Sequence, residues 1–465
     1  MNDVYLNRLF NPSSIAIIGA SPENGKIGNV ILKNIKKGFR GRLYAVNPKY
    51  DNIEDIRCYS SVLNIECDID IAVIALSSKA VMNALVECKS KGVGFVIIIA
   101  GGFAEIGIEG MELEDKLKDA IKGSNTHIIG PNTVGIYLPM HGVSTALTVA
   151  ERSGFPAYGD VAYISQSGAL GLLTLDSISY FNMRVHSFIN LGNRADIDEI
   201  DLMKYLGRLS DVRAIMMYIE SFKDGRSFFN TAREITCKTP VIILKGGATE
   251  SGYVAASHHT GAMMQNGSSL DGIFRQCGVI RAKNETELID YAYGLAYTKR
   301  PKGANIAVIT SAGGVGVVTS DLLSETDSHL KLATLSDNTM KNLMEVISSI
   351  GSVHNPVDMT VEATNSQYDE ALSILNEAEE VDGIILYALF QSPHVDKELI
   401  PVLEKWKDKK SLVVGTIGGK YTTDMIMVAS NSNIPIYPSI ERSVKVMDVL
   451  YKYELYLEKV KKIDE

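Results

Sequence analysis

The first 140 residues alternate short apolar runs with amphipathic stretches, and this alternation limits the possible folds more than any other feature of the chain. The apolar runs have the length of strands, and the amphipathic stretches have the period of helices. Strands and helices that alternate in this way build a doubly wound parallel sheet with helices on both faces. We expect strands at Ser14–Ile18, Leu43–Val46, Ile71–Leu76, Val96–Ala100 and His127–Ile129, and helices around Val30–Lys37, Val81–Lys89 and Met111–Ile121.

The alternation stops around residues 140–158, in a connection that contains Ser, Gly and Pro, so we place a domain boundary there. A second strand and helix series begins at Val161–Ile164 and continues with strands at Ala214–Ile219 and Val241–Ile243. With 465 residues and 46% apolar content, the chain can bury several cores. This length predicts about three domains.

Charge and cysteine content exclude several classes of protein. The net charge is −9, with acidic and basic residues interspersed, so neither nucleic acid nor an anionic membrane is expected as a partner. The five cysteines are scattered and form no C-x-x-C pair, so no disulfide framework and no metal site is indicated. No signal peptide pattern opens the chain, and runs such as Phe95–Ala100 are too short to span a bilayer. We expect a cytoplasmic protein.

A Gly-rich turn, Gly19–Gly28, connects the first expected strand to a helix. Such a turn offers backbone N–H groups and a helix N-terminus to phosphate. Its glycine spacing differs from G-x-G-x-x-G, and Asn47-Pro48-Lys49 follows the second strand where NAD-binding proteins carry an acid. A lysine there suits a phosphorylated ribose or a diphosphate, so CoA or NADP fits better than NAD. The alternative is a turn that binds nothing.

Two more strand ends point to the same edge of the sheet. Ala100-Gly101-Gly102 and the segment Gly130–Gly135, which contains Asn132, place glycines and small polar groups just after their strands. Ligands of open α/β sheets bind at the carboxyl ends of the strands. The alternative is that these glycines only permit tight left-handed turns.

The second domain contains a candidate anion site at Ser165-Gln166-Ser167-Gly168, between a strand and an apolar helix. Hydroxyls, unpaired backbone N–H groups and the positive end of a helix dipole meet in such a turn, which predicts binding of phosphate or an acyl phosphate. The alternative is a structural serine cap. Glu220 follows the strand that ends at Ile219, where a carboxylate can accept a hydrogen bond from an imidazole and stabilise its charged form.

The pair His258-His259 lies in a segment of small residues that follows Lys245-Gly246-Gly247, which we expect to end the strand at Val241–Ile243. Imidazole can take up a phosphoryl group as a nucleophile and pass it on. The alternative is that His258 and His259 are ordinary loop residues without a catalytic role.

Taken together, these motifs resemble the α subunit of ADP-forming acetyl-CoA synthetase, a nucleoside-diphosphate-forming acyl-CoA synthetase related to the succinyl-CoA synthetase α subunit. The resemblance extends over almost the whole chain, including Ser311–Gly316 and Asn355-Pro356-Val357-Asp358 near the C-terminus. It rests on the ordered series G-A-S-x₃-G-K-x-G, N-P-K, G-F-A-E, G-P-N-x-x-G, S-Q-S-G-A-L, L-G-N-x-A-D, Y-I-E-S, L-K-G-G-x-T-E-S-G and S-H-H-T-G-A.

The resemblance implies an α/β fold with a Rossmann-like CoA-binding domain (1–140) followed by two flavodoxin-like parallel-sheet domains (141–300 and 301–465). It implies a reaction in which acyl-CoA, ADP and phosphate give the free acid, ATP and CoA, through an acyl phosphate and a phosphohistidine. The implied CoA-site residues are Gly19, Ala20, Ser21, Lys26, Gly28, Lys49, Ser77, Ser78, Gly101, Gly102 and Asn132.

The same resemblance implies that phosphate binds at Ser165, Gln166, Ser167 and Gly168, that His259 carries the phosphoryl group, and that Glu220 orients it. The family usually has a small or hydroxyl residue where this chain has His258, so either ring remains a candidate. Thr133 replaces the family's usual cysteine in G-P-N-x-x-G, so a thiol there is not required.

The chain has no Walker motif and no ATP-grasp-like segment. The resemblance therefore implies an ATP-grasp β subunit, in an α2β2 assembly, that binds ADP or ATP with Mg²⁺. Two other classes remain as alternatives: a CoA-binding regulatory or scaffold protein with the same fold, and an NAD(P)-dependent Rossmann oxidoreductase.

Overall fold

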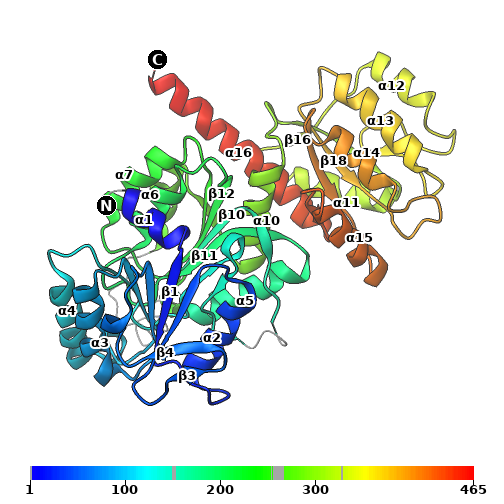
Figure 1. Cartoon of the computed structure of the whole chain (residues 1–465). Helices are drawn as coiled ribbons and strands as arrows, with labels where there is room; N and C mark the ends of the chain where they lie inside the picture. The colour runs from blue at the N-terminus through cyan, green and yellow to red at the C-terminus, as the bar shows by residue number, and fades with distance from the viewer. Residues whose placement is uncertain (1–2, 149–152, 253, 255–266, 326–327, 465) are drawn as a thin grey trace. The chain divides into compact units, whose positions relative to one another are not determined.

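The computed structural model describes residues 3–148, 153–252, 254, 267–325 and 328–464. Within these residues the chain forms two compact units, one from residues up to 180 together with 184–283, and the other from 181–183 together with 284–465. Figure 1 shows the chain coloured from the N-terminus in blue to the C-terminus in red. The first unit holds the first two sheets and the second unit holds the third.

The first sheet has the strand order β3-β4-β2-β1-β5-β6-β7 and is parallel apart from the β3–β4 pair. This arrangement confirms the predicted α/β class, and β1 and β7 have the predicted bounds. Strands β1, β5 and β6 are buried along their whole length because helices cover both faces of the sheet. The strands are β1 (Ser14–Ile18), β2 (Arg42–Val46), β3 (Asn52–Ile53), β4 (Ile56–Tyr59), β5 (Ile71–Ile74), β6 (Phe95–Ile98) and β7 (His127–Ile129).

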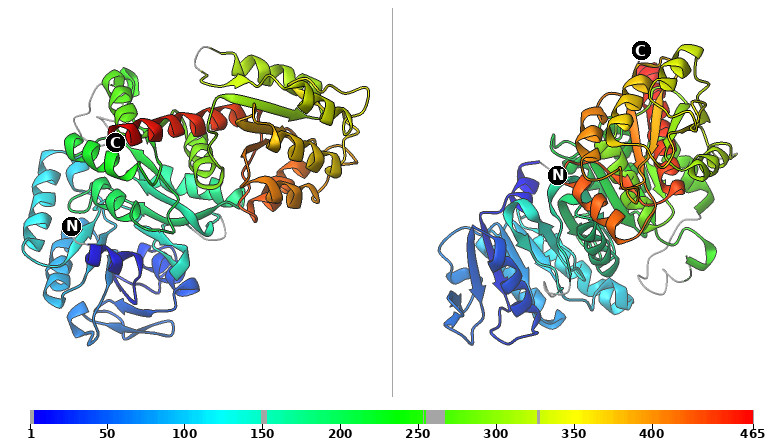
Figure 2. Two further views of the ribbon diagram at one scale, coloured as in Figure 1. Left: turned by 90° about the horizontal axis from the view of Figure 1, so that it is seen from above. Right: turned by 90° about the vertical axis from the view of Figure 1, so that its right-hand side faces the viewer.

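The helices of the first sheet divide between its two faces at the β1–β5 boundary. The chain moves from β1 to β2 in one direction and from β5 through β6 to β7 in the other, so right-handed crossovers place α2 on one face and α3 and α4 on the opposite face. Figures 1 and 2 show α3 and α4 side by side. The helical segments up to the end of this sheet are α1 (Asp3–Phe10), α2 (Ile27–Gly38), η1 (Val62–Asn64), α3 (Ser78–Lys91), η2 (Ala104–Ile106) and α4 (Ile108–Ile121).

The second sheet has the order β14-β13-β12-β10-β11-β8-β9, with β8 antiparallel to β11 and to β9. The sequence did not indicate the short strands β8 and β9; β8 lies just before the connection at residues 140–158, and β9 lies within it. Strand β13 extends two residues beyond the predicted Ile243. Lys245 is its last residue and pairs with Ile219, so the strand is broken at Gly246 and not at Lys245. The strands are β8 (Ile136–Leu138), β9 (Val143–Ser144), β10 (Ala157–Ser165), β11 (Arg184–Asn190), β12 (Ala214–Ile219), β13 (Val241–Lys245) and β14 (Ile280–Ala282).

The helical segments that follow β8 in this unit are η3 (Pro139–His141), α5 (Gly168–Tyr180), α6 (Glu199–Leu206), α7 (Gly225–Ile235) and α9 (Gly267–Gln276). One continuous apolar core joins the two sheets of the unit, from Leu6, Leu9 and Phe10 of α1 through Ile17 of β1 to Ile219 of β12. This shared core holds the carboxyl edges of the two sheets in place relative to each other.

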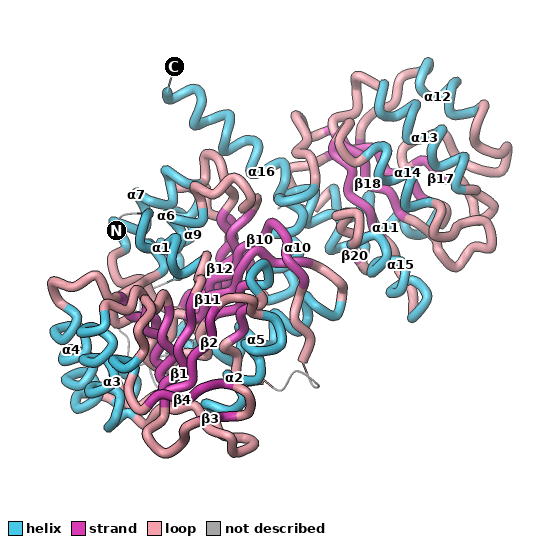
Figure 3. Tube along the Cα trace, viewed as in Figure 1, coloured by secondary structure: helices cyan, strands magenta, loops and turns pink. Residues whose placement is uncertain are grey.

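The second unit is built on a third parallel sheet of order β16-β15-β18-β19-β20, with β17 also paired to β15. Helices α10, α11 and α16 pack together, and α13 packs with α12 and α14; Figure 3 shows the strands in magenta and the helices in cyan. Its strands are β15 (Asn305–Thr310), β16 (Lys331–Leu332), β17 (Val357–Asp358), β18 (Gly383–Tyr387), β19 (Ser411–Gly415) and β20 (Ile436–Tyr437). Its helices are α10 (Glu285–Tyr297), α11 (Gly313–Leu323), α12 (Asp337–Met344), α13 (Asn365–Glu377), α14 (Leu399–Trp406), α15 (Lys420–Ser430) and α16 (Ile440–Asp464).

Among the described residues, none of the helices combines the length and the apolar character that crossing a bilayer requires.

Candidate active site

The turn after β1 packs tightly against the start of α2. Gly19 has a φ of +92°, and a Cβ built on Gly28 would lie 2.1 Å from the carbonyl oxygen of Gly19. Only glycine fits both positions, because a side chain at Gly28 would separate the helix from the turn. The side-chain amide of Asn29 also donates to the carbonyl oxygen of Ser21 at 2.9 Å. The backbone of this turn can therefore approach a ligand phosphate closely.

The segment after β2 is joined to the same turn. Asn47 Nδ2 donates to the carbonyl oxygen of Ala20 at 2.8 Å, and the backbone N–H of Lys49 donates to Asn47 Oδ1 at 3.0 Å. The Lys26 and Lys49 side chains are exposed, and Lys26 Nζ lies 3.8 Å from a carboxylate oxygen of Glu23. Two lysines therefore flank the glycine turn at the surface.

The loops after β5, β6 and β7 contact one another at this edge. A Cβ on Gly102 would lie 3.2 Å from Ser78 Oγ, and a Cβ on Gly101 would lie 3.3 Å from Asn132 Oδ1. The candidate CoA residues thus follow five neighbouring parallel strands, and they lie along one edge of the first sheet.

In the second sheet, the candidate anion turn connects β10 to α5. Ser165 is fully buried, and its hydroxyl donates to the carbonyl oxygen of Ser167 at 2.7 Å. Ser167 Oγ accepts from the backbone N–H of Leu170 at 3.4 Å, as a helix-capping serine does. Ser165 therefore shapes the turn from inside, whereas Gln166, Ser167 and Gly168 face the cavity described below.

Glu220 lies directly after β12, as predicted, and Gln166 joins it to the anion turn. Gln166 Oε1 accepts from the backbone N–H groups of Glu220 at 2.9 Å and Ser221 at 3.2 Å. The Glu220 side chain is buried, and its Oε1 accepts from the hydroxyl of Tyr218 at 3.2 Å. Burial and the neighbouring carboxylate raise the pKa of Tyr218, which therefore stays a donor. The carboxylate is thus fixed beside the turn.

Lys245 is a buried cation beneath Glu220 that the sequence did not indicate as a site residue. Its ammonium group donates to the carbonyl oxygen of Glu220 at 2.6 Å and also to that of Gly246. Burial lowers the pKa of Lys245 to about 8, against the opposing effect of Glu220. Lys245 therefore ties the end of β12 to the beginning of the segment that leads to the two histidines.

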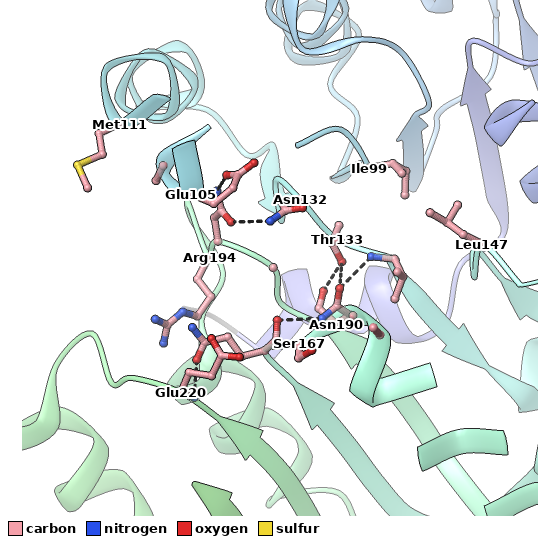
Figure 4. A pocket seen from close by; sticks show the side chains of 17 residues that line it. Ile99, Glu105, Met111, Asn132, Thr133, Leu147, Ser167, Asn190, Arg194 and Glu220 are labelled. Atoms are coloured by element: carbon pink, nitrogen blue, oxygen red, sulfur yellow. Dashed lines mark hydrogen bonds between the residues drawn. The ribbon is translucent and has the colours of Figure 1, made fainter. Parts of the chain in front are cut away.

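A cavity of about 460 Å³ lies between the carboxyl edges of the first two sheets, as Figure 4 shows. Its walls come from the loops after β6, β7, β10, β11 and β12, with Leu147 and Met111 completing them. Five of the predicted residues line it, namely Asn132, Gln166, Ser167, Gly168 and Glu220. The other candidate CoA residues lie outside it, along the edge of the first sheet.

Four cavity residues end or follow β11, and the sequence assigned them no role: Asn190, Gly192, Asn193 and Arg194. Asn190 Nδ2 donates to the carbonyl oxygens of Ser165 at 2.9 Å and Gln166 at 3.2 Å, so this side chain braces the anion turn from behind. Arg194 has a φ of +61° and its guanidinium contacts Glu199 Oε2 at 2.9 Å and Ser221 Oγ at 2.8 Å. Asn193 and Arg194 both lie in the motif L-G-N-x-A-D, which is the sequence signal that could have identified them as site residues.

Glu105, from the G-F-A-E motif, forms a second carboxylate of the cavity. Its oxygens accept from the side-chain amide of Asn193 and from the backbone N–H of Gly102. Burial acts to raise the pKa of Glu105, but these hydrogen bonds outweigh it and lower the pKa overall. Glu105 is therefore ionised, and Asn193 connects it to Asn132 at 3.3 Å.

His258 and His259 lie outside the described residues. Apart from Val254, the described chain continues up to Gly252 on one side and resumes at Gly267 on the other.

Three family models match the chain. They are a CoA binding domain at residues 13–139, a succinyl-CoA ligase-like flavodoxin domain at 158–295, and a Ligase-CoA domain at 306–455.

Curated relatives match along nearly the whole chain. The chain is 36% identical to the α subunit of acetate–CoA ligase [ADP-forming] I of Pyrococcus furiosus, over 98% of this chain and 99% of that protein. It is 35% identical to acetate–CoA ligase [ADP-forming] I of Archaeoglobus fulgidus, over 96% of this chain but only 64% of that longer protein. The structure of acetyl-coenzyme A synthetase 1 of Ca. Korarchaeum cryptofilum, in complex with phosphate and ADP, matches with a TM-score of 0.90, 29% identity and 98% coverage of both chains.

The matches to a CoA binding domain, a succinyl-CoA ligase-like flavodoxin domain and a Ligase-CoA domain place the chain in the class of CoA ligases. Within this class, the chain belongs to the family of the α subunits of ADP-forming acetate–CoA ligases. The resemblance predicted from the motifs is confirmed. The alternatives of an oxidoreductase and a scaffold protein receive no support, because the relatives named here are ligases.

Proposed function

We propose that the chain is the α subunit of an ADP-forming acyl-CoA synthetase, which converts acyl-CoA, ADP and phosphate to the acid, ATP and CoA. The observation that carries this proposal is the Gln166 bridge, which holds the anion turn and the Glu220 carboxylate together on one cavity. A phosphate bound at the turn would lie beside a carboxylate suited to a charged imidazole. The family of ADP-forming acetate–CoA ligases supports the assignment.

CoA would bind along the carboxyl edge of the first sheet. Its phosphates would lie against the turn at Gly19–Gly28, where Ser21 and the exposed Lys26 supply a hydroxyl and a charge, with Lys49 nearby. Its thiol arm would pass the loops at Ser77, Ser78, Gly101 and Gly102 and reach Asn132, which lines the cavity. The match of residues 13–139 to a CoA binding domain supports this path.

The chemistry would proceed in two transfers. An oxygen of phosphate held at Gln166–Gly168 attacks the thioester carbonyl carbon, the C–S bond breaks, and the CoA thiolate leaves. A ring nitrogen of His259 then attacks the phosphorus atom of the acyl phosphate, and the acid leaves as a carboxylate. Glu220 accepts the N–H of the other ring nitrogen and stabilises the charge that develops on the imidazole. The N-terminal dipole of α5 and its free N–H groups stabilise the phosphate throughout.

The final transfer, from phosphohistidine to ADP, would take place on a partner. An ATP-grasp β subunit in an α2β2 assembly would hold ADP with Mg²⁺, which neutralises the transferring phosphates. The Pyrococcus relative is named as a subunit, and the longer Archaeoglobus relative extends well beyond the region matched here. Both observations support a second subunit or domain that completes the enzyme. The cytoplasm, where CoA and ADP occur together, is the compartment this proposal requires.

The test is phosphorylation of the full chain by acetyl phosphate, followed by intact mass at neutral pH. The wild type should gain one phosphoryl group, and His259→Ala should gain none while still binding CoA in calorimetry. Labelling that persists in His259→Ala but disappears in His258→Ala would transfer the role to His258. Labelling that persists when both His258 and His259 are replaced by Ala would exclude a phosphohistidine at this pair.

Glu220→Gln should lower the extent of labelling, because replacing the carboxylate by an amide weakens a charge-assisted hydrogen bond by ~2–3 kcal/mol. The matched control is Glu234→Gln, which removes a carboxylate from the exposed side of α7 and should label like the wild type. Equal labelling of Glu220→Gln and wild type would remove Glu220 from the site.

A further inference from the structure

The loop after β11 runs along the loop after β7, so the first two sheets contact each other beside the cavity. The backbone N–H of Asn193 donates to the carbonyl oxygen of Pro131 at 2.9 Å, and that of Ala195 donates to the carbonyl oxygen of Gly130 at 2.9 Å. Gly192 has a φ of +56°, and a Cβ there would lie 2.3 Å from the Pro131 carbonyl oxygen. Only glycine permits the two backbones to approach this closely.

The Asn193 side chain reaches from this loop to three side chains of the first domain. Its Nδ2 donates to Glu105 Oε2 and, at 3.0 Å, to Glu114 Oε2. Its Oδ1 accepts from Asn132 Nδ2 at 3.3 Å. Figure 4 shows Glu105 and Asn132 together at one end of the cavity, with Glu220 at the other. Because one amide group here faces two acceptors and one donor, an asparagine suits this position and an aspartate does not.

The same short segment contacts both halves of the proposed site. At the end of β11, the Asn190 amide donates to two backbone carbonyls of the anion turn. Three residues later, Asn193 holds Asn132, which lines the cavity at the end of the proposed CoA path. It also holds Glu105, which accepts from the backbone N–H of Gly102 on the same path. The segment therefore joins the phosphate side of the cavity to the CoA side.

The two proposed transfers depend on this connection to different degrees. In the first transfer, an oxygen of phosphate held by the second sheet attacks the carbonyl carbon of a thioester held by the first, and the C–S bond breaks as the CoA thiolate leaves. The reacting atoms must come within about 3–3.5 Å, and a misplacement of ~1 Å can slow such a step ~100-fold. The second transfer would use the anion turn and Glu220, which both belong to the second sheet, so it does not require the first sheet in register.

We propose that Asn193 is a positioning residue for the first transfer: by joining Glu105 and Asn132 to the loop after β11, it sets the distance between the thioester of CoA and the bound phosphate. This inference rests on the proposed function, because it assigns the thioester to the first sheet and the phosphate to the second. Asn193 acts through its hydrogen-bond partners and takes no part in making or breaking bonds.

The test measures the two transfers separately in the full chain. The rate of CoA release from acetyl-CoA and phosphate, followed by chromatography, reports the first transfer, and phosphorylation by acetyl phosphate, followed by intact mass, reports the second. Asn193→Ala should slow CoA release about 10-fold or more at saturating acetyl-CoA and phosphate. Its CoA affinity in calorimetry and its rate of labelling by acetyl phosphate should stay as in the wild type.

Asn193→Asp keeps the size of the side chain but brings a third carboxylate against Glu105 and Glu114, which repel it. It should show the same difference between the two transfers as Asn193→Ala. A loss of folding would instead lower CoA affinity and both transfers together, so the difference separates positioning from stability.

The matched control is Asn125→Ala, at the opposite edge of the first sheet just before β7, where Asn125 Oδ1 accepts from the hydroxyl of Tyr5 at 3.2 Å. This variant should carry out both transfers like the wild type. Equal slowing of both transfers in the Asn193 variants, or slowing of neither, would overturn the proposal.

A wild type that is phosphorylated by acetyl phosphate but releases no CoA from acetyl-CoA would also overturn the proposal, because the first transfer would then not take place between these two sheets. Failure of the wild type to become phosphorylated by acetyl phosphate would instead contradict the proposed function, so the two failures are distinguishable.

Discussion

At the scale of single residues, Lys245 is a buried cation whose hydrogen bonds go to backbone carbonyls. Its side chain is 9% exposed, and its ammonium donates to two backbone carbonyls. A carbonyl oxygen is a weaker counterpart than a carboxylate, so the charge is poorly compensated for its loss of water. The pKa of about 8 expresses this cost.

The lowered pKa of Lys245 predicts a pH dependence of stability. Between about pH 8 and 10.4 the unfolded chain keeps this proton while the folded chain loses it, so folding becomes more favourable as the pH rises. Below pH 8 both states are protonated and the full cost of burying the charge is present. We therefore compare free energies of unfolding from urea denaturation at pH 7.5 and pH 9.5. The stability of the wild type relative to Lys245→Met should be ~1–3 kcal/mol greater at pH 9.5 than at pH 7.5. A difference that is the same at both pH values would contradict this reading of Lys245.

At the scale of elements, the close packing of α2 on the turn after β1 makes this contact sensitive to substitution. Gly28→Ala places a Cβ against the Gly19 carbonyl oxygen, where the separation would be 2.1 Å. The helix must move away, and overpacking of this kind costs ~1–3 kcal/mol. We expect a lower urea midpoint and at least 10-fold weaker binding of CoA in calorimetry.

The matched control for Gly28→Ala is Gly225→Ala, in the first turn of α7, where a Cβ would meet nothing within 4 Å. This variant should keep CoA affinity and raise stability by about 0.4–1 kcal/mol, because alanine restricts the unfolded chain. Unchanged CoA affinity in Gly28→Ala would show that the turn and helix need not pack this closely for binding.

At the scale of the whole molecule, the proposed division of labour between subunits makes a sharp prediction. The full chain with acyl-CoA and phosphate should release CoA and become phosphorylated, but it should form no ATP when ADP and Mg²⁺ are added. Addition of the β subunit should restore ATP formation, since the partner would supply the metal and the basic groups that phosphoryl transfer to ADP needs. ATP synthesis measured by luciferase with the purified chain alone would contradict this division.

The sequence by itself determined the elements whose signals are local. Strands β1, β7 and β12 were predicted with their observed bounds, because a buried strand is a continuous apolar run that needs no distant partner to be recognised. The turns at Gly19–Gly28 and Ser165–Gly168 were also predicted, since glycine and hydroxyl chemistry depends on neighbouring residues. The family followed from the order of such motifs.

Only the tertiary structure decided which side chains share the cavity. Asn190 contacts Thr133 across 57 residues, and Lys245 contacts the Glu220 carbonyl across 25 residues. Strand β8 pairs with β11, and Leu147 lines the cavity together with loops of both sheets, so both likewise depend on contacts between distant segments. Burial and hydrogen bonding between remote residues are set by how the two sheets pack. A local pattern in the sequence therefore cannot reveal the lining of the cavity or a buried lysine.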